Sequence, residues 1–108
     1  MSIFTDIVGN TARNKILEVF LKGQGFDYSS GDVASLSKTN RMTTYNNMGP
    51  LEESKLIKVS RVLGNRTLYT LDQTNPIVKT LINIYNQLVN QELNRLSKED
   101  LDRLNVQI

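Results

Sequence analysis

The sequence contains no cysteine, no histidine and no tryptophan, and only two of its 108 residues are proline. Without cysteine there are no disulfide bonds, thiol nucleophiles, iron–sulfur clusters or thiolate zinc sites. Without histidine the chain lacks the most common metal ligand and the usual general base near neutral pH. The remaining side chains offer no evident nucleophile–base pair or ligand cluster. The composition therefore predicts a protein that is not an enzyme and that holds no metal ion or cofactor.

Long apolar stretches are missing as well. No run approaches the roughly 18 to 20 apolar residues that a membrane span requires. Residues 1–6 lack the basic start and apolar core that are typical of a signal peptide. We therefore expect a soluble, cytoplasmic protein without membrane contact. Its 108 residues, of which 39% are hydrophobic, suit a single compact unit.

Charge is distributed unevenly along the chain. Residues 38–66 carry six basic and two acidic side chains, a local charge of +4, whereas residues 72–108 sum to −1. A basic middle segment indicates an anionic partner that docks there. The alternative is an ordinary fluctuation of charge along short windows.

Helical signals begin at the first residues. Residues 3–8 predict a short helix ended by Gly9, and Asn10 is the predicted N-cap of a second helix that runs to Lys22.

The polar connection of residues 23–31 follows, with Phe26 and Tyr28 as its expected anchors to the core. Ser29 or Ser30 then caps a further short helix.

A third predicted segment starts with a helix at about Asn40, in which Thr44, Met48 and Leu51 recur on one buried stripe. Pro50 inside this helix lacks the N–H that the carbonyl of residue 46 requires. We therefore expect a kink, or a helix that ends near Met48. Such a kink either sets the angle at which the helix docks or is a harmless bend on the solvent side.

Two β-like runs come next, residues 57–63 and 66–71, joined at Gly64-Asn65 by a two-residue hairpin turn. Ile57, Val59 and Leu71 are its expected buried residues.

This order of helix, helix, turn, helix and hairpin resembles the winged helix-turn-helix family, without a gap from Val33 to Ile57. Ser37-Lys38-Thr39 falls on the turn of that family, and residues 52–57 are similar to its exit into the hairpin, which is called the wing. Residues 8–13 are similar to the first-helix entry of ArsR-like regulators, which are close to MarR-like ones. The resemblance covers residues 3–72. It implies a mainly α fold with a small two-stranded β-hairpin, an α+β class. ArsR-like metal sensing does not carry over, because the chain has neither Cys nor His.

The recognition helix of this family enters the DNA major groove, where Asn, Arg and Thr side chains read base edges. The predicted base-reading residues are Asn40, Arg41, Thr43, Asn46 and Asn47. The predicted contacts to the DNA backbone or minor groove are Lys38, Tyr45, Lys55, Lys58, Arg61, Asn65 and Arg66. The Tyr45 ring is expected to pack under the helix. Taken singly, each of these residues also suits an ordinary solvated surface.

From Pro76 onward a long helix is predicted, with more apolar residues than one stripe can hold. The same helix of a second copy of the chain is the simplest partner against which the additional apolar residues can be buried. The predicted interface residues are Ile77, Val78, Leu81, Ile82, Tyr85, Leu88, Val89, Leu93 and Leu96. We thus expect a winged-helix DNA-binding domain at residues 1–72 and a C-terminal dimerisation segment at 73–108. A short last helix capped by Ser97 is expected to fold back onto the dimer or to fray.

The sequence favours a homodimeric regulator of transcription that binds a palindromic site in double-stranded DNA. Two alternatives remain: a winged helix used as a protein–protein interaction module, and an architectural or partition protein that coats DNA. No residue demands a small-molecule effector.

Overall fold

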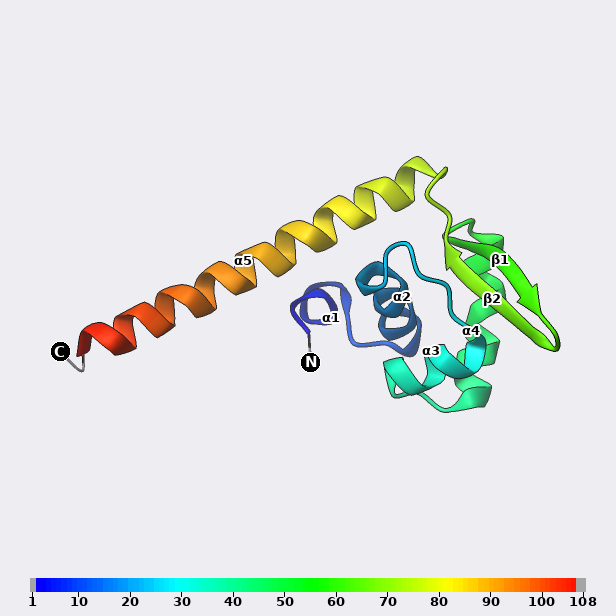
Figure 1. Cartoon of the computed structure of the whole chain (residues 1–108), viewed down its shortest axis with the longest axis horizontal. Helices are drawn as coiled ribbons and strands as arrows, with labels where there is room; N and C mark the ends of the chain where they lie inside the picture. The colour runs from blue at the N-terminus through cyan, green and yellow to red at the C-terminus, as the bar shows by residue number, and fades with distance from the viewer. Residues whose placement is uncertain (1, 107–108) are drawn as a thin grey trace.

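The computed structural model describes the backbone of residues 2–106 and the side chains of residues 2–98. Within this part of the chain, five helices and two strands follow one another. Their bounds are α1 (Ile3–Val8), α2 (Ala12–Lys22), α3 (Ser30–Ser37), α4 (Arg41–Glu53), β1 (Ile57–Leu63), β2 (Arg66–Leu71) and α5 (Pro76–Val106). Figure 1 shows α1 to α4 and the hairpin gathered into one body, with α5 extending past α1. The predicted α+β class is confirmed.

Local capping signals place most of the helix ends. The Ser29 hydroxyl accepts from the Asp32 N–H at 3.2 Å, and the Asp32 carboxylate accepts from the Ser29 N–H at 3.0 Å, which forms a capping box at α3. At α2 the prediction is wrong by one residue. Thr11 is the N-cap instead of Asn10, because the Thr11 hydroxyl accepts from the Asn14 N–H at 3.2 Å.

Helix α2 is the centre of the core. All six consecutive residues from Ile16 to Leu21 are buried. Six residues of an α-helix point in every direction around its axis, so α2 must be covered on all sides. It lies against α1, α3, α4, α5 and β2. The Phe20 ring also meets the Tyr28 ring edge to face, with ring centres 5.9 Å apart.

Three hydroxyl groups join α3 to α4 through the turn between them. Ser37 Oγ lies 2.7 Å from the Val33 carbonyl and 2.7 Å from Thr39 Oγ1. Thr39 Oγ1 lies 2.6 Å from Thr44 Oγ1, and the buried Thr44 hydroxyl donates to the Asn40 carbonyl at 2.9 Å. These hydrogen bonds satisfy polar groups in the core and fix the start of α4 relative to α3.

Helix α4 continues through Gly49 and Pro50 to Glu53, so the expected end near Met48 is wrong. Met48 and Leu51, one on each side of Pro50, are 4% and 2% exposed, and their packing holds both parts of the helix to the core. Gly49 helps as well. A proline ring clashes with the Cβ of the preceding residue in a helical conformation, and glycine has no Cβ.

The hairpin pairs Ile57 with Leu71 at its base and Leu63 with Arg66 at its tip. Gly64 has φ +61°, which glycine adopts without strain, and closes the two-residue turn. The pairing shifts between Val59 and Arg61, so Ser60 is the extra residue of a β-bulge. Ile57 and Leu71 are buried as predicted, but Val59 is 42% exposed, contrary to expectation. In this structure the core covers β1 only at its first residue.

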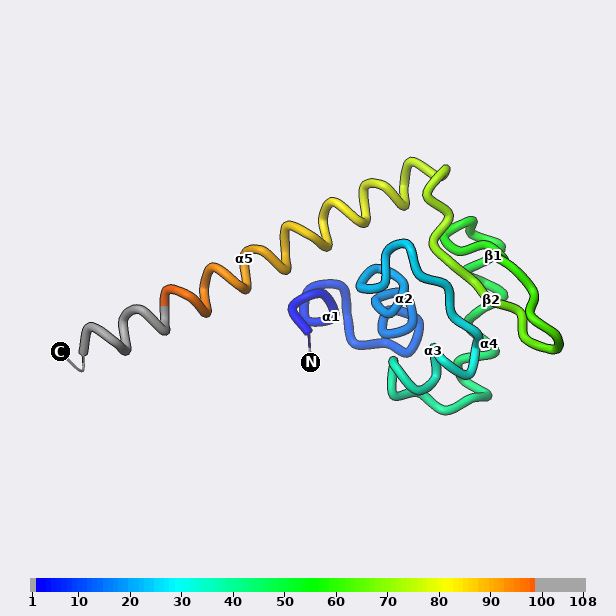
Figure 2. The backbone as a smooth tube through the Cα atoms, in the orientation of Figure 1, coloured from blue at the N-terminus to red at the C-terminus, as the bar shows by residue number. Residues whose placement is uncertain are grey.

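A third backbone segment adds to the hairpin. Tyr28 and Tyr69 exchange two backbone hydrogen bonds of 2.8 Å, which form an isolated antiparallel bridge. Figure 2 shows the connection between α2 and α3 passing beside β2. Tyr28 thus anchors this connection as predicted, whereas Phe26 is 68% exposed and does not.

Helix α5 is continuous from Pro76 to Val106. Ser97 therefore lies inside it, and the expected break before a short last helix is wrong. Contacts expected from the side chains of residues 101–108 lie outside the described residues. The chain measures 59 × 30 × 25 Å, and none of its described helices is both long and apolar enough to cross a membrane.

The pair Gly49-Pro50 yields a prediction for stability. Pro50→Ala restores the missing helical hydrogen bond and should raise the free energy of unfolding by about 2 kcal/mol. This value is the cost of proline inside a helix less the stabilisation that proline provides by restricting the unfolded chain. Gly49→Ala meets no other group, so only the Pro50 ring opposes its helix-propensity gain of about 1 kcal/mol. The full gain should therefore emerge only in the Pro50→Ala background. Urea unfolding of the two single variants and the double variant measures this coupling, and strictly additive values would contradict the explanation.

Candidate functional site

The outward face of α4 is exposed to solvent. Thr44, Met48 and Leu51 anchor the opposite face and are nearly inaccessible to solvent. Met42 and Asn46 lie one turn apart on the outward face, and both are exposed. The helix therefore presents its first two turns to a partner without losing its attachment to the core.

The structure distributes the five predicted base-reading residues unevenly. Arg41 and Asn46 are exposed, and Thr43 is half-buried. The Asn40 side chain is the N-cap of α4 and accepts from the Thr43 N–H at 2.7 Å. Asn47 is held at both ends of its amide, because it accepts from Arg13 Nε at 2.9 Å and donates to the Thr43 carbonyl at 2.8 Å. Two of the five side chains, those of Asn40 and Asn47, thus already serve the fold.

Met42 is a candidate that the sequence reasoning missed. Its side chain is 69% exposed in the first turn of α4, beside the polar residues selected for base contact. A helical wheel drawn from Thr44, Met48 and Leu51 places it on the outward side, so the signal was present in the spacing. Arg13, which reaches α4 from α2, has no comparable local signal.

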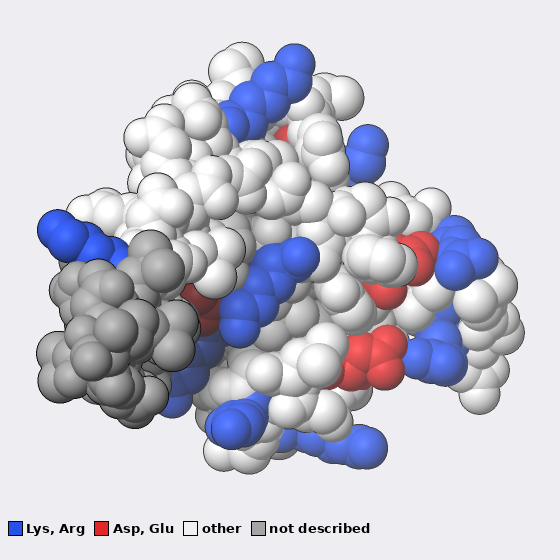
Figure 3. All heavy atoms as spheres, turned by 60° about the vertical axis from the view of Figure 1, so that its left-hand side comes forward, with Lys and Arg blue, Asp and Glu red and all other residues white. Residues whose placement is uncertain are grey.

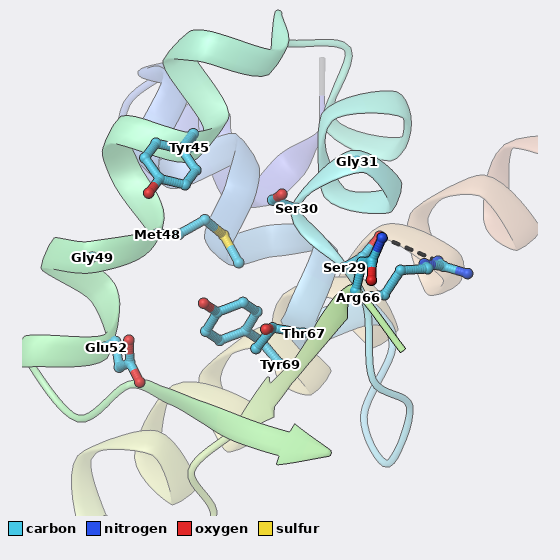
Figure 4. Close-up of a pocket in the computed structure, with 11 residues that line it drawn as sticks. Ser29, Ser30, Gly31, Tyr45, Met48, Gly49, Glu52, Arg66, Thr67 and Tyr69 are labelled. Atoms are coloured by element: carbon cyan, nitrogen blue, oxygen red, sulfur yellow. Dashed lines mark hydrogen bonds between the residues drawn. The ribbon is translucent and has the colours of Figure 1, made fainter. Parts of the chain in front are cut away.

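A cleft of about 610 Å³ separates α4 from β2 and the start of α3. Figure 4 shows Tyr45, Met48 and Glu52 of α4 on one side and Thr67 and Tyr69 of β2 facing them. Burial raises the pKa of Tyr69, and the charges of Glu52 and Tyr45 add to the rise.

The expected position of Tyr45 needs correction. Its ring is 71% exposed and lines the cleft, and it does not pack under the helix. Thr44 and Met48, its neighbours toward the core, already fill the space beneath α4.

Arg61 of β1 forms an ion pair with Asp27, with 2.8 Å between its Nε and Asp27 Oδ2. The Ser60 hydroxyl donates to the same oxygen at 2.9 Å. Neighbouring residues of a regular strand point to opposite faces, so the bulge at Ser60 is what brings both donors to one carboxylate. The hydrogen bonds from Arg61 and Ser60 hold the pKa of Asp27 below its usual value.

Arg66 of β2 is attached to α3 in a similar way. Its guanidinium lies 3.0 Å from Asp32 Oδ2 and donates to the Ser29 hydroxyl at 3.3 Å. The backbone N–H of Ser29, the Ser29 hydroxyl and the Arg66 charge together hold the pKa of Asp32 below its usual value. The hairpin is therefore connected to the rest of the body by two ion pairs, one on each strand.

These ion pairs change the meaning of the basic segment. Two of its six basic side chains, Arg61 and Arg66, face carboxylates from outside the segment. The other four, Lys38, Arg41, Lys55 and Lys58, are exposed. They lie at the start of α4 and beyond its end, and the 13 residues of this helix span about 20 Å. Figure 3 shows basic side chains spread over one face of the molecule, with several acidic groups beside them.

The predicted interface residues of α5 fall into two groups. Val78 and Tyr85 are buried in the chain's own core, where Tyr85 meets the Phe4 ring of α1 at 5.7 Å. The half-buried members pack against the same core: Leu81, Ile82, Leu88 and Val89. Ile77, Leu93 and Leu96 are exposed by 62%, 55% and 43%.

Solved structures of similar shape identify the arrangement. HlyU from Vibrio cholerae superposes with a TM-score of 0.60 at 20% identity, over 80% of this chain and 84% of that one. The homodimeric winged helix-turn-helix DNA-binding domain of Mb0332 from Mycobacterium bovis, described as a possible ArsR-family regulator, superposes with a TM-score of 0.58 at 18% identity, over 86% and 81%. The fold is a winged helix-turn-helix.

Two further comparisons bound the likeness. The ferric uptake regulator from Francisella tularensis matches with a TM-score of 0.55 at 26% identity, over 60% of this chain, which spans about half the length of that protein. No protein-family model and no curated protein matches the sequence.

In the winged helix-turn-helix, α3 and α4 are the helix pair, and β1 and β2 are the wing. The hydrogen-bonded hydroxyl groups of Ser37, Thr39 and Thr44 span the turn between the two helices. Among the described residues no three or more acidic side chains gather in the manner of a metal site.

The wing attachments predict a dependence on acid. Because the pKa of Asp27 in the folded chain lies below its ordinary value of about 3.9, its stabilising effect is complete above that value and is lost as the pH falls through the lower one. The protection of the wing amides against hydrogen exchange, taken relative to the intrinsic exchange rate at each pH, should therefore fall below about pH 4. Asp27→Asn should lower this protection already at neutral pH, whereas Asp6→Asn, at an exposed position of α1, should not. Equal protection in both variants would contradict a role for the ion pair.

Proposed function

We propose that the chain is a cytoplasmic homodimer that binds specific sequences of double-stranded DNA and regulates transcription. The observation that carries this proposal is the outward face of α4, exposed over its first two turns and anchored from behind by Thr44, Met48 and Leu51. A helix presented in this way fits the major groove, which is about 12 Å wide. Lactococcus lactis ZitR, whose structure in complex with DNA superposes with a TM-score of 0.61 at 14% identity over 78% of this chain and 57% of that one, supports this use of the fold.

Arg41, Met42 and Asn46 are the proposed base readers. Arginine binds guanine through two hydrogen bonds, asparagine does the same with adenine, and an apolar side chain packs against the thymine methyl group. Asn40 and Asn47 shape this surface from within, because their side chains cap α4 and connect it to Arg13. Thr43 is a flanking contact.

Phosphate contacts are proposed at both ends of α4. Lys38 lies just before its start, and Lys55 and Lys58 follow its end about 20 Å away, a span sufficient to reach both edges of the major groove. The cleft beside Tyr45, between α4 and the wing, receives the sugar–phosphate backbone of the DNA. Asn65 at the wing tip meets the next minor groove, with Arg61 and Arg66 behind it.

Residues 73–108 are proposed to dimerise the DNA-binding domain of residues 1–72. The α5 residues Leu93 and Leu96 lie beyond the last residues that pack on the core, and Ile7 and Val8 of the adjacent α1 are exposed by 61% and 46%. A second copy related by a two-fold axis covers both apolar surfaces together. Two copies of α4 then face half-sites about one helical turn apart, which calls for a palindromic target.

The DNA-contact assignment is tested on sequences selected from a random duplex pool. Arg41→Ala should cost about 1 to 3 kcal/mol at one base position and relax the preference there, because a bidentate contact to guanine is lost. Lys58→Ala should weaken all sequences alike and reduce the salt dependence of binding, because only a phosphate contact is lost. Fluorescence anisotropy at several salt concentrations measures both effects.

Lys79→Ala is the matched control for this experiment, since Lys79 is exposed on α5 and belongs neither to α4 nor to the wing. If Arg41→Ala left both affinity and preference unchanged, α4 would not be the reading helix.

Dimerisation is tested by sedimentation equilibrium. The double variant Leu93→Asp, Leu96→Asp should shift the chain from twice its monomer mass to the monomer, because charge would replace the apolar surface between copies. Asn94→Asp, exposed on the same helix, adds charge outside that surface and should leave the dimer intact. A wild-type chain that sediments as a monomer at all concentrations would refute the proposal.

A protein–protein interaction module is the second candidate. It is favoured by the exposed apolar residues Met42, Val62 and Leu63 on α4 and the wing. A gel shift with random duplex DNA separates the two, because a DNA-binding domain retains weak, salt-sensitive affinity for any duplex and an interaction module has none.

A further inference from the structure

A second cavity lies at the other end of α3 from the cleft. It has a volume of about 330 Å³ and is bounded by α2, by the connection between α2 and α3, and by the last residues of α3. Its apolar walls are Val19, Phe26, Tyr28 and Leu36. This volume is at the lower end of the range that small organic ligands occupy.

Glu18 of α2 lines this cavity and is 91% buried, with a residue exposure of only 9%. Within the part of the chain that the structure describes, its Oε2 atom has no hydrogen-bond partner. A buried carboxylate oxygen without a donor destabilises the folded chain, whereas an apolar residue at the same position of α2 would not. The fold therefore does not account for this carboxylate. Oε2 itself is closed to solvent, so a donor in the cavity meets it when the side chain turns toward the opening.

Two apolar side chains at the cavity are also exposed to solvent, without another segment of the described chain to cover them. Phe26 and Leu36 are exposed by 68% and 58%, although both belong to short segments that pack on the core through other residues. Their side chains lie beside the same opening as Glu18. Apolar surface and a donor-seeking carboxylate at one cavity specify a ligand with two distinct parts.

We propose that this cavity binds a small apolar molecule that carries an amine, with the amine on the Glu18 carboxylate and the apolar body against Phe26 and Leu36. An ammonium group supplies several charge-assisted donors to a carboxylate, which makes it a stronger partner than a neutral hydroxyl. The Phe26 ring adds a surface that attracts cations and apolar groups alike.

The charges around Glu18 set the selectivity. Lys15 and Lys22 lie on α2 on either side of Glu18 and line the cavity. Tyr85 of α5 lies close enough for the Glu18 charge to add to the effect of burial, which raises the Tyr85 pKa to about 12. The two lysines weaken the attraction for a cation, so removing one of them should tighten amine binding.

Ser37 places this cavity next to the turn. Ser37 lines the cavity, and its hydroxyl group is one of the three hydrogen-bonded hydroxyls that fix the start of α4. Amine binding itself is independent of the proposed DNA-binding function, whereas any effect on DNA affinity through Ser37 rests on it. The decisive experiment therefore contains no DNA.

The test is a titration of the ¹⁵N-labelled full chain with 2-phenylethylamine, followed by NMR. The amine should shift the amide signals of Val19, Leu36 and Ser37 in a saturable way, and 3-phenylpropionic acid, of nearly the same shape, should bind about tenfold more weakly or not at all. Glu18→Gln should reduce the amine affinity about tenfold or more, and Lys22→Gln should increase it. Glu53→Gln, which neutralises an exposed carboxylate, should leave it unchanged.

Three results would overturn the proposal: no saturable shift up to about 10 mM amine, equal affinity for the acid, or undiminished amine binding by Glu18→Gln. Loss of folding cannot imitate the expected result, because Glu18→Gln removes a buried charge without changing the shape of the side chain. Thermal unfolding should show that this variant is at least as stable as the wild type.

Discussion

The burial of α2 on every side between Ile16 and Leu21 is the constraint on which the rest of the molecule depends. Because every side of the stretch from Ile16 to Leu21 is covered, α1, α3, α4, α5 and β2 must all find their places around one helix. The position of α4 relative to the wing is one result, since both contact the same central helix. The position of Glu18 is another. It belongs to the buried stretch although its Oε2 atom has no hydrogen-bond partner among the described residues.

Elements set by neighbouring residues were predictable from the sequence. The capping box of Ser29 and Asp32, the turn at Gly64 and the start of α5 at Pro76 each depend on interactions within a few residues. Elements set by distant residues were not. The continuity of α4 through Pro50 depends on how Met48 and Leu51 pack, and the exposure of Val59 and Phe26 depends on what the core leaves uncovered. Sequence spacing identifies a face, but it does not show whether another segment covers that face.

In the candidate site, too, the sequence predicts local features but not interactions with distant residues. The residue types on α4 and the wing were identified from sequence, but not their existing bonds. Asn40 was counted as a base reader although its place at the start of the helix also makes it a cap, and the cap is what the structure shows. Arg61 and Arg66 are predicted contacts to the DNA backbone or minor groove, and the spacing does not show that Asp27 and Asp32, 34 residues away in each case, pair with them. Met42 is missing from the predicted base readers, although its angular position on α4 places it on the outward face.

The two ion pairs of the wing have a consequence for how the molecule meets a partner. A hairpin joined only at its base samples many orientations and loses that freedom when it docks, at a cost in entropy. Here Asp27 and Asp32 restrict the wing before any encounter, and the bridge between Tyr28 and Tyr69 restricts it further. The wing tip therefore has fewer orientations relative to α4 than a hairpin joined only at its base. If the wing docks on the proposed DNA target, less entropy is lost on docking, and a target with a different spacing between its contacts must deform to fit.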